Sequence, residues 1–569
     1  MADDAQEGAA RSRWAALAFW LCLALCAGLL LAAVPTRFSV YDVKDDAFMF
    51  ARYARNLLTH GAVAWNPGGE PTYGLTSLLF LLVVLPIRAA CPGSPALVVS
   101  AASNLCGLAF VGLFIALLLR QALEPVGRRV VVAFFVFSLA VPALHVSAHF
   151  ASGMDTTFAL AWLTAYLLLV KEHERRDTTR SAAAVGVWGG LTYVARPDLM
   201  LFTLAVPAWW VVFGSAGRSR RRAGGILCLT VAVLGLELAA AAWYFGSALP
   251  LPFYAKGVHH YAASMRGRYS AVPTEKLLRF FISYQPLVLA ILAALLVRFR
   301  AFVRRLTAAD AALAVAAATF VAYYATMVLQ VMPFNQRFYY PVLPVLAWLG
   351  SQAVLALAGR PGGPTRRWAG GHAAALAALG LVVVAGFLVP SGLWLRERWA
   401  AGQADAHVGR FGLQHGYRAQ WDTYWYRLDA FSALPDDLVI ATTEIGLPGA
   451  MNPRKTIVDL ACLNETDFAL HGFSADGLFA KYQPDLFYLH PDYAEMNREI
   501  LTHPQFRRAY EWFPGREVLG TYLGVAICRE SEHYAAMRAI VAARAGVDTP
   551  AHGGYHPPVV FLPHAGKRR

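Results

Sequence analysis

The chain has 569 residues, of which 57% are hydrophobic and only 15% charged, and this composition excludes an ordinary soluble protein. The formal net charge of +14 would suit a nucleic-acid partner. The basic residues stand in short clusters between apolar segments, however, and that pattern reports membrane topology, so we expect no nucleic acid among the partners.

Apolar segments recur from residue 14 to residue 390, and a helix needs about 20 such residues to cross the hydrocarbon core. The first segment follows Arg11 and Arg13, so it enters from the cytoplasm. A cleaved signal peptide is the alternative, which the length of the segment and the many later segments disfavour. The predicted crossings are 14–34, 98–119, 129–147, 152–171, 181–195, 199–214, 223–245, 278–298, 307–330, 338–358 and 370–390.

Basic loops fix the orientation of these predicted spans. They lie at 120–129, 171–180, 217–222, 298–305 and 359–367, and with eleven crossings every one of them falls on the cytoplasmic side. We therefore predict a multi-pass protein of the cytoplasmic (inner) membrane, with a cytoplasmic N-terminus and an extracytoplasmic C-terminal region.

The segment "LTSLLFLLVVLPI", residues 75–87, is apolar but short for a full span. Counting it as a crossing would invert every later loop, so we interpret it as re-entrant or interfacial. Such backbone is tolerated only where protein or a cavity buries it. The alternative is a genuine second span that returns near residues 90–97.

Residues 391–569 lack the long apolar segments that precede them. They contain many charged and aromatic residues and short β-rich runs. The predicted fold is thus an α-helical polytopic membrane protein in which residues 1–390 form the membrane domain and 391–569 an extracytoplasmic α/β domain. Strands are predicted at 438–443, 455–460, 485–490 and 524–528, and the Pro/Gly/His-rich end at 552–569 is expected to be loosely ordered.

The seven cysteines fit no metal-binding spacing. Five of them lie in or beside apolar segments, where they are expected to pack as small residues. Only Cys462 and Cys528 fall in the C-terminal region, and outside the cell these two could form a disulfide.

The first predicted external loop, residues 35–74, carries two adjacent acids, Asp45 and Asp46, at the start of a helical pattern. Ala47, Ala51, Ala54 and Leu58 form an apolar stripe, with Asp45, Arg52, Arg55 and Asn56 on the opposite side. We expect this helix to lie along the outer membrane surface. The acids have two interpretations, a helix cap with Asp42 or a catalytic function.

The other predicted external turns also carry polar residues. Ser152 and Asp155 fit a helix start, and His145 and His149 at i, i+4 are more typical of packing than of a metal site. Arg196, Lys256 and Arg337 each stand at a separate turn on the same predicted face as the acids. One cation per turn is typical of snorkelling, but three together favour a site for an anion.

These blocks together resemble a known family. The stretch "DDAFMFARYARNLLTHGAVAWNPGGEPTYGLTS" is similar to the first external loop of GT-C-type membrane glycosyltransferases, closest to the mycobacterial terminal arabinofuranosyltransferase AftB group. The similarity continues in "SGMDT", "ARPD", "LPLPFYAK" and "EIGLPGAMNPRKTIVDLACLN". Two positions depart from it: residues 72–77 stand where the family often has Glu-Gly-Tyr-Thr-Asn, and Leu251 or Pro252 where it often has Asn.

The resemblance implies transfer of an arabinofuranosyl residue from a polyprenyl (decaprenyl) phosphate to a cell-wall or lipoglycan arabinan outside the cytoplasmic membrane. A GT-C transferase for another polyprenyl-phosphate sugar is one alternative. A transporter or flippase of lipid-linked sugar is another, but transporters concentrate ionisable groups near the bilayer midplane and have repeated halves. Here the charges collect at one predicted surface and the sequence shows no repeat.

Sugar transfer needs a base for the acceptor hydroxyl, and we expect Asp45 to be that base and Asp46 to orient it. If a divalent cation, Mg or Mn, takes part, these two acids are its expected ligands; no other cofactor is expected. The donor phosphate is expected to bind Arg196, Lys256 and Arg337, with Arg52 and Arg55 as second choices. Further substrate contacts are expected from Trp65, Asn66, Tyr73, His149 and Asp198, in a protein that acts as a monomer with the lipid donor, the glycan acceptor and the bilayer.

Overall fold

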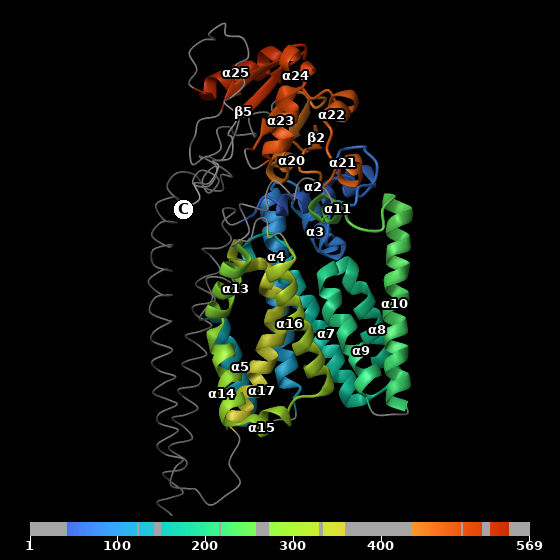
Figure 1. Cartoon of the computed structure of the whole chain (residues 1–569), viewed down its shortest axis with the longest axis vertical. Coiled ribbons are helices and arrows are strands. Elements are labelled where there is room, and N and C mark those ends of the chain that lie inside the picture. Colours follow the sequence, from blue (N-terminus) through green and yellow to red (C-terminus); the bar gives the residue numbers. More distant parts are fainter. Residues whose placement is uncertain are drawn as a thin grey trace, which may run out of the picture. The chain divides into compact units, whose positions relative to one another are not determined.

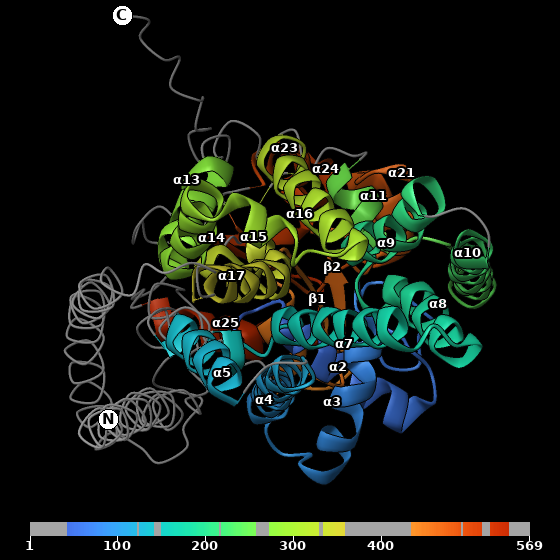
Figure 2. The same cartoon turned by 90° about the horizontal axis from the view of Figure 1, so that it is seen from below.

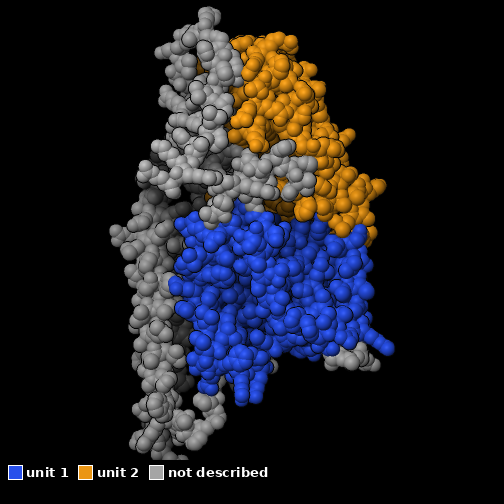
Figure 3. Space-filling view, viewed as in Figure 1, with its two compact units in different colours: residues 1–42, 100–235, 271–411 blue, residues 43–99, 236–270, 412–569 orange. Residues whose placement is uncertain are grey.

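The computed structural model describes residues 43–121, 125–140, 149–214, 218–257, 272–328, 330, 334–358, 434–490, 493–514 and 524–545. The chain divides into two compact units, which Figure 3 shows in different colours. Unit 1 comprises residues 1–42, 100–235 and 271–411, and unit 2 comprises 43–99, 236–270 and 412–569. The predicted spans at 14–34 and 370–390, His145 and the end of the chain at 552–569 lie outside the described residues.

Unit 1 is built from helices. Apolar side chains every three or four residues give each helix a face to bury, and the helices pack in pairs, α7 on α8, α9 on α16 and α14 on α17 (Figures 1 and 2). The bounds are α4 Pro95–Leu119, α5 Pro125–Ala140, α7 Thr156–Arg176, α8 Thr179–Ala195, η2 Pro197–Leu199, α9 Met200–Phe213, α10 Arg218–Phe245, α13 Val272–Ser283, α14 Gln285–Val297, α15 Phe299–Val303, α16 Ala308–Thr326, η3 Phe334–Val342 and α17 Leu343–Ala358. The start of α4, up to residue 99, and the end of α10, from residue 236, belong to unit 2.

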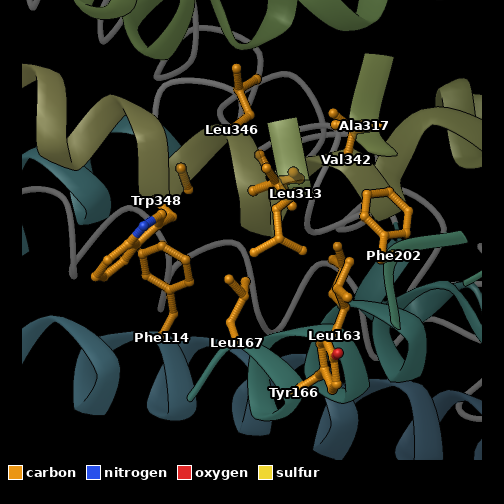
Figure 4. Packing of buried hydrophobic residues seen from close by; sticks show 14 of the residues in the cluster. Phe114, Leu163, Tyr166, Leu167, Phe202, Leu313, Ala317, Val342, Leu346 and Trp348 are labelled. Atoms are coloured by element: carbon orange, nitrogen blue, oxygen red, sulfur yellow. The ribbon is translucent and has the colours of Figure 1, made fainter. Parts of the chain in front are cut away.

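The core of unit 1 is rich in aromatic side chains (Figure 4). Phe114 stacks on Phe135 with ring centroids 4.2 Å apart, and the buried Tyr166 donates its hydroxyl to the carbonyl oxygen of Thr203 at 3.0 Å. The Trp348 indole donates to the buried carboxylate of Asp310 at 2.7 Å. Tyr166 and Asp310 are thus both paired, as a low-dielectric interior favours for buried polar groups.

Four helices among the described residues are long and apolar enough to cross a membrane: Pro95–Leu119, Arg220–Phe245, Ala308–Thr326 and Gln336–Ala358. The span predicted at 278–298 is instead a broken pair, α13 and α14, bent by 77°. Large apolar side chains stay exposed on these helices, among them Leu296 at 85% and Trp243 at 86%, as expected where lipid is the solvent. The chain is therefore a membrane protein, whereas the total of eleven crossings stays a prediction.

Unit 2 contains a five-stranded sheet in the order β2-β1-β3-β5-β4. The three strands β2, β1 and β3 are parallel, whereas β5 runs antiparallel to both β3 and β4. Its elements are β1 Val439–Thr442, α20 Gly446–Met451, β2 Thr456–Asp459, α21 Thr466–His471, α22 Ala475–Lys481, β3 Leu486–Leu489, α23 Ala494–Thr502, α24 Pro504–Ala509, β4 Tyr510–Pro514, β5 Gly524–Cys528 and α25 Tyr534–Ala545.

Strands β1, β2, β3 and β5 coincide with the four strands predicted from β-rich runs. The sequence analysis missed β4, "YEWFP", which follows α24 directly and pairs on one side only. Cys462 and Cys528 are both free thiols, so the disulfide considered between them is absent.

The first loop belongs to unit 2 together with the C-terminal sheet, so the compact units differ from a single division at residue 390. The helix predicted from Asp45 is present as α2, Ala47–His60, and the neighbouring α11 spans Leu251–Gly257. The segment predicted as re-entrant or interfacial forms α3, Leu78–Ala90, a helix of 13 residues. It is shorter than the roughly 20 residues that a full crossing takes.

Helix α2 does not lie with its polar side in water, which corrects the sequence-based expectation. Arg52 and Asn56 are buried, whereas Leu58, from the apolar stripe, is 47% exposed. The physical reason is that α2 packs against α3 and α20, so both sides of the helix are covered by protein. Its polar residues therefore bond to other parts of unit 2.

The buried Arg52 guanidinium is surrounded by oxygen acceptors. It donates to the carbonyl oxygens of Trp65 at 2.7 Å, Gly449 at 2.7 Å, Asn452 at 3.0 Å and Lys455 at 2.9 Å, and to the side-chain oxygen of Asn66 at 3.0 Å. These bonds join α2 to the loop after α20, about 400 residues later in the chain. Arg52 thus has a structural role, and the hypothesis that it binds the donor phosphate is withdrawn.

Trp65 and Asn66, expected to contact substrate, also pack against the sheet. The Trp65 indole donates to the carbonyl oxygen of Ile457 at 2.9 Å, and the Asn66 side-chain oxygen accepts from the Ile457 backbone N–H at 2.8 Å. Ile457 lies on β2, the edge strand, so the first loop covers backbone groups that would otherwise be unpaired.

We predict that Arg52→Ala lowers the free energy of unfolding of unit 2 by more than about 3 kcal/mol, because several buried acceptors lose their donor together. The matched control is Arg454→Ala, since Arg454 is 67% exposed and pairs with Asp436. A surface pair contributes about 1 kcal/mol or less. Unfolding of both variants in detergent measures the difference, and equal midpoints would contradict the structural role of Arg52.

Candidate functional site

The Asp45 carboxylate is held by the start of helix α20. One of its oxygens accepts the Gly446 N–H at 3.0 Å and the other accepts the Leu447 N–H at 2.7 Å. The acid is buried and does not cap α2, because α2 has Asp46 at its N-cap position with no side-chain cap bond. The bonds of Asp45 therefore go to α20 and not to α2, whereas Asp42, the other acid of the proposed cap, lies outside the described residues.

The close approach of these two segments depends on a glycine. A Cβ atom built on Gly446 would lie 1.8 Å from the Asp45 carbonyl oxygen, which no side chain can tolerate. Gly446 therefore lets the sheet region reach the acid with its backbone.

Glu444 lies two residues before Gly446, between β1 and α20, and is 7% exposed. Its electrostatic neighbours are Asp45, Asp46 and Asp459. The sequence analysis quoted this acid within a family block but gave it no role. An acid directly after a β-rich run was the available signal, because the ends of parallel strands commonly carry functional groups.

Both carboxylate oxygens of Asp459, at the end of β2, accept hydrogen bonds. Its carboxylate accepts the backbone N–H groups of Ala461 at 2.8 Å, Leu463 at 2.9 Å and Asn464 at 2.7 Å, and the Asn464 side-chain amide at 2.8 Å. The Asn464 oxygen in turn accepts the Tyr53 hydroxyl at 2.8 Å. Asp459 thus orders the turn that ends "DLACLN" and joins it to α2.

Burial raises the pKa of all three acids. The pKa of Asp45 rises to about 7, because desolvation disfavours the charge more than the Leu447 N–H favours it, and Asp46 adds repulsion. Burial and then the three neighbouring acids raise the pKa of Glu444 to about 8. Burial raises the pKa of Asp459 to about 7 against its hydrogen bonds. Groups that exchange a proton near neutral pH are suited to acid–base chemistry.

Four further residues of unit 2 were expected at the site: Asp46, Arg55, Tyr73 and Lys256. Asp46 and Arg55 are half-buried, and Arg55 donates to the Pro453 carbonyl oxygen at 2.7 Å. Tyr73 is buried and stacks on Phe245 with centroids 4.6 Å apart. Lys256, on α11, is half-buried.

In unit 1, Arg196 forms a bidentate pair with Asp198, with N···O distances of 2.9 and 3.0 Å. Asp198 also accepts the Tyr324 hydroxyl at 2.6 Å. Both charged residues were expected to contact substrate, and the structure pairs them with each other. The pairing reduces the charge that Arg196 can offer to an anion.

Asp155, directly before α7, interacts electrostatically with both Arg196 and Arg337. The Arg337 guanidinium lies over the rings of Phe334 and Phe338, at 4.8 and 4.9 Å from their centroids. His149 is buried and packs on Tyr340 with centroids 4.1 Å apart, in agreement with the packing interpretation. Unit 1 therefore gathers two guanidinium and two carboxylate groups in one buried cluster.

Within the described ranges, three possible metal ligands come together at Asp437, Glu532 and His533. Asp45 and Asp46 are not members of that group. Each oxygen of Asp45 accepts one backbone N–H and keeps a second lone pair, so the residue types remain compatible with a hard cation.

We predict that the protein loses stability as pH rises from about 5 to about 9, because three folded-state pKa values lie above the ordinary values near 4. The folded chain holds protons that the unfolded chain releases, so the stabilisation is complete below the unfolded pKa and is lost through the folded one. Thermal unfolding midpoints across this range measure the fall. Glu444→Gln should reduce it and the exposed control Glu495→Gln should not; a wild-type midpoint independent of pH would contradict the assignment.

No protein-family model matches the chain, and no curated protein does. Several solved structures match the chain, however. The apo crystal structure of ArnT from Cupriavidus metallidurans matches with a TM-score of 0.52 at 14% identity, covering 91% of this chain and 98% of ArnT. The structure of ArnT bound to undecaprenyl phosphate matches with a TM-score of 0.50 at 12% identity, covering 89% and 98%. The chain therefore has the fold of ArnT.

Proposed function

We propose that the protein is a GT-C glycosyltransferase that transfers a sugar from a polyprenyl-phosphate carrier to a glycan acceptor outside the cytoplasmic membrane. Two facts support this proposal: the ArnT fold, which in ArnT accommodates undecaprenyl phosphate, and the buried acid Asp45 with its pKa near neutral pH. The fold is the observation that carries it, and the buried carboxylate of Asp45, held by two backbone N–H groups, adds a candidate for the base that sugar transfer requires.

In the proposed reaction, the acceptor hydroxyl attacks the anomeric carbon while its proton passes to Asp45. The new carbon–oxygen bond forms as the bond from the anomeric carbon to the phosphate oxygen breaks, and that oxygen keeps the electron pair. Negative charge grows on the leaving phosphate, so cations that are already in place stabilise the transition state. The phosphate ligands stay those expected from the sequence, Arg337, Arg196, Lys256 and Arg55.

For the sugar, we propose arabinofuranose from decaprenyl phosphate, with an arabinan acceptor, as in the AftB group. The support is the similarity of the first loop and of the "LPLPFYAK" and "EIGLPGAMNPRKTIVDLACLN" blocks. Structure adds a reason why the first and last blocks occur together, since Asp45 in one bonds directly to Gly446 and Leu447 in the other. A transferase for another polyprenyl-phosphate sugar would use the same chemistry.

We predict that purified protein in lipid vesicles transfers label from decaprenyl-phosphoryl arabinose to short arabinan acceptors, and that Asp45→Asn lowers the rate by about 10²–10⁴-fold. The matched control is Asp476→Asn, because Asp476 is 93% exposed. Unchanged transfer by Asp45→Asn would remove the base assignment. Transfer of only another sugar would contradict the arabinose proposal, and passage of label across vesicles without a new glycosidic bond would favour a transporter.

Repeating the assay with a chelator tests the proposed divalent cation at Asp45 and Asp46.

We predict that Arg337→Gln lowers kcat/KM by about 10²-fold or more, because a poorly hydrated guanidinium that faces the developing phosphate charge is lost. Arg300→Gln, at an exposed arginine of α15, should leave kcat/KM within about 2-fold, because an exposed charge contributes little. Kinetics with varied donor concentration separate the two variants. An Arg337→Gln enzyme as active as the control would exclude Arg337 as a phosphate ligand.

A further inference from the structure

Two buried glutamines lie beside the charged cluster of unit 1. Gln336 directly precedes Arg337 on η3 and is 4% exposed, and its side-chain oxygen accepts no hydrogen bond in the described part of the chain. Gln330 is 0% exposed, and its side-chain oxygen likewise has no donor among the described residues. Buried polar atoms are nearly always paired in folded proteins, so each exception requires an explanation.

Hydrogen bonds connect Gln330 to the charged cluster. Its side-chain nitrogen donates to the Tyr324 carbonyl oxygen at 2.9 Å and to the Tyr339 hydroxyl at 2.8 Å, and the Tyr324 hydroxyl donates to Asp198 at 2.6 Å. A carbonyl oxygen can only accept, so the amide nitrogen must face Tyr324 and the orientation of the amide is fixed. The unpaired oxygen of Gln330 is therefore a property of the fold and does not result from a reversed amide.

Gln336 also has an unusual backbone conformation. Its φ angle of 58° lies in the left-handed region, which residues other than glycine seldom adopt. The next residue, Arg337, holds its guanidinium over the rings of Phe334 and Phe338, and the Phe338 ring in turn stacks on Tyr324 with centroids 5.6 Å apart. Backbone strain of this kind is typical of functional positions.

The chemistry of an amide oxygen selects the ligand that it can bind. An ionised phosphate offers only acceptors, so an amide oxygen cannot bind it, and a polyprenyl chain offers no donor at all. The hydroxyl groups of a sugar do donate. Because the sugar of a polyprenyl-phosphate sugar is bonded directly to the phosphate, acceptors beside a phosphate ligand such as Arg337 are placed to receive them.

We propose that the side-chain oxygens of Gln336 and Gln330 accept hydrogen bonds from hydroxyl groups of the donor sugar and so determine which sugar is bound beside Arg337. This inference rests on the proposed glycosyl transfer and adds two specificity-determining residues to it. The unpaired oxygens in the free protein gain donors when the sugar binds. A sugar that lacks the matching hydroxyl leaves a buried acceptor unpaired and is rejected.

The test measures transfer in the vesicle assay from decaprenyl-phosphoryl arabinose, or from whichever polyprenyl-phosphate sugar the wild type uses, and from analogues with one sugar hydroxyl replaced by hydrogen. For the hydroxyl that Gln336 binds, wild-type kcat/KM should fall about 10-fold with the analogue, the loss expected for one hydrogen bond. Gln336→Met, which lacks the acceptor, should lose about 10-fold with the full donor and no more with that analogue. A structural role would lower both rates equally and preserve the discrimination.

Gln352→Met is the matched control. Gln352 is also 4% exposed, on α17, and its side-chain nitrogen donates to the Gln121 side-chain oxygen at 3.1 Å. This variant should discriminate between the donors as the wild type does. Gln330→Met should lose discrimination at a different sugar hydroxyl, and because that readout is a ratio of two rates, a smaller folded fraction leaves it unchanged.

Thermal unfolding without substrate gives a second readout. Gln336→Met should unfold at or above the wild-type midpoint, because a buried oxygen without a donor is replaced by an apolar group. A clearly lower midpoint would show that the oxygen is paired in the free protein and would overturn the inference.

Equal discrimination by the wild type, Gln336→Met and Gln330→Met against every analogue would also overturn the inference and leave the proposed function intact, with bound water as the partner of the two amides. A wild type that transfers no polyprenyl-phosphate sugar would overturn the proposed function and this inference together.

Discussion

The burial of charge where the first loop meets the C-terminal sheet is the constraint on which unit 2 depends. Arg52 and Asp45 both lie out of water, and each needs partners that can replace hydration. Three of the four carbonyl oxygens around Arg52 and both N–H groups at Asp45 come from the same segment, residues 446–455. Backbone groups some 400 residues away in the chain thus hold Asp45, just before α2, and Arg52, near the middle of α2.

This arrangement has a consequence for the proposed chemistry. The acid stands on the first loop, but its orientation depends on the N–H groups of α20, and its pKa depends on burial, on those N–H groups and on Asp46. The C-terminal region is therefore part of the candidate site and more than an attached acceptor-binding domain. Repulsion among these acids destabilises the folded chain, and the network around Arg52 offsets it, as is common where a functional site stores unfavourable interactions.

In unit 1, buried charged side chains interact with side chains of the opposite charge. Arg196 is neutralised by Asp198, and Arg337 stands against aromatic rings with Asp155 as its electrostatic partner. Such a cluster can accept an added anion with less rearrangement than a group of unpaired cations, because its side chains are already fixed by each other. Of the cations predicted for the phosphate, Arg196 is therefore compensated directly by the carboxylate of Asp198.

The sequence by itself determined the membrane class, helix α2 after the paired acids, and strands β1, β2, β3 and β5, because apolar length, helical periodicity and β-rich runs are local signals. It could not show that Arg52, Trp65 and Asn66 face the sheet, since a polar stripe looks the same whether water or backbone carbonyls receive it. The raised pKa of Glu444 was equally hidden, because it depends on the burial and on the neighbouring acids that the fold supplies. Only the tertiary structure decided these points, through contacts between residues that are far apart in the chain.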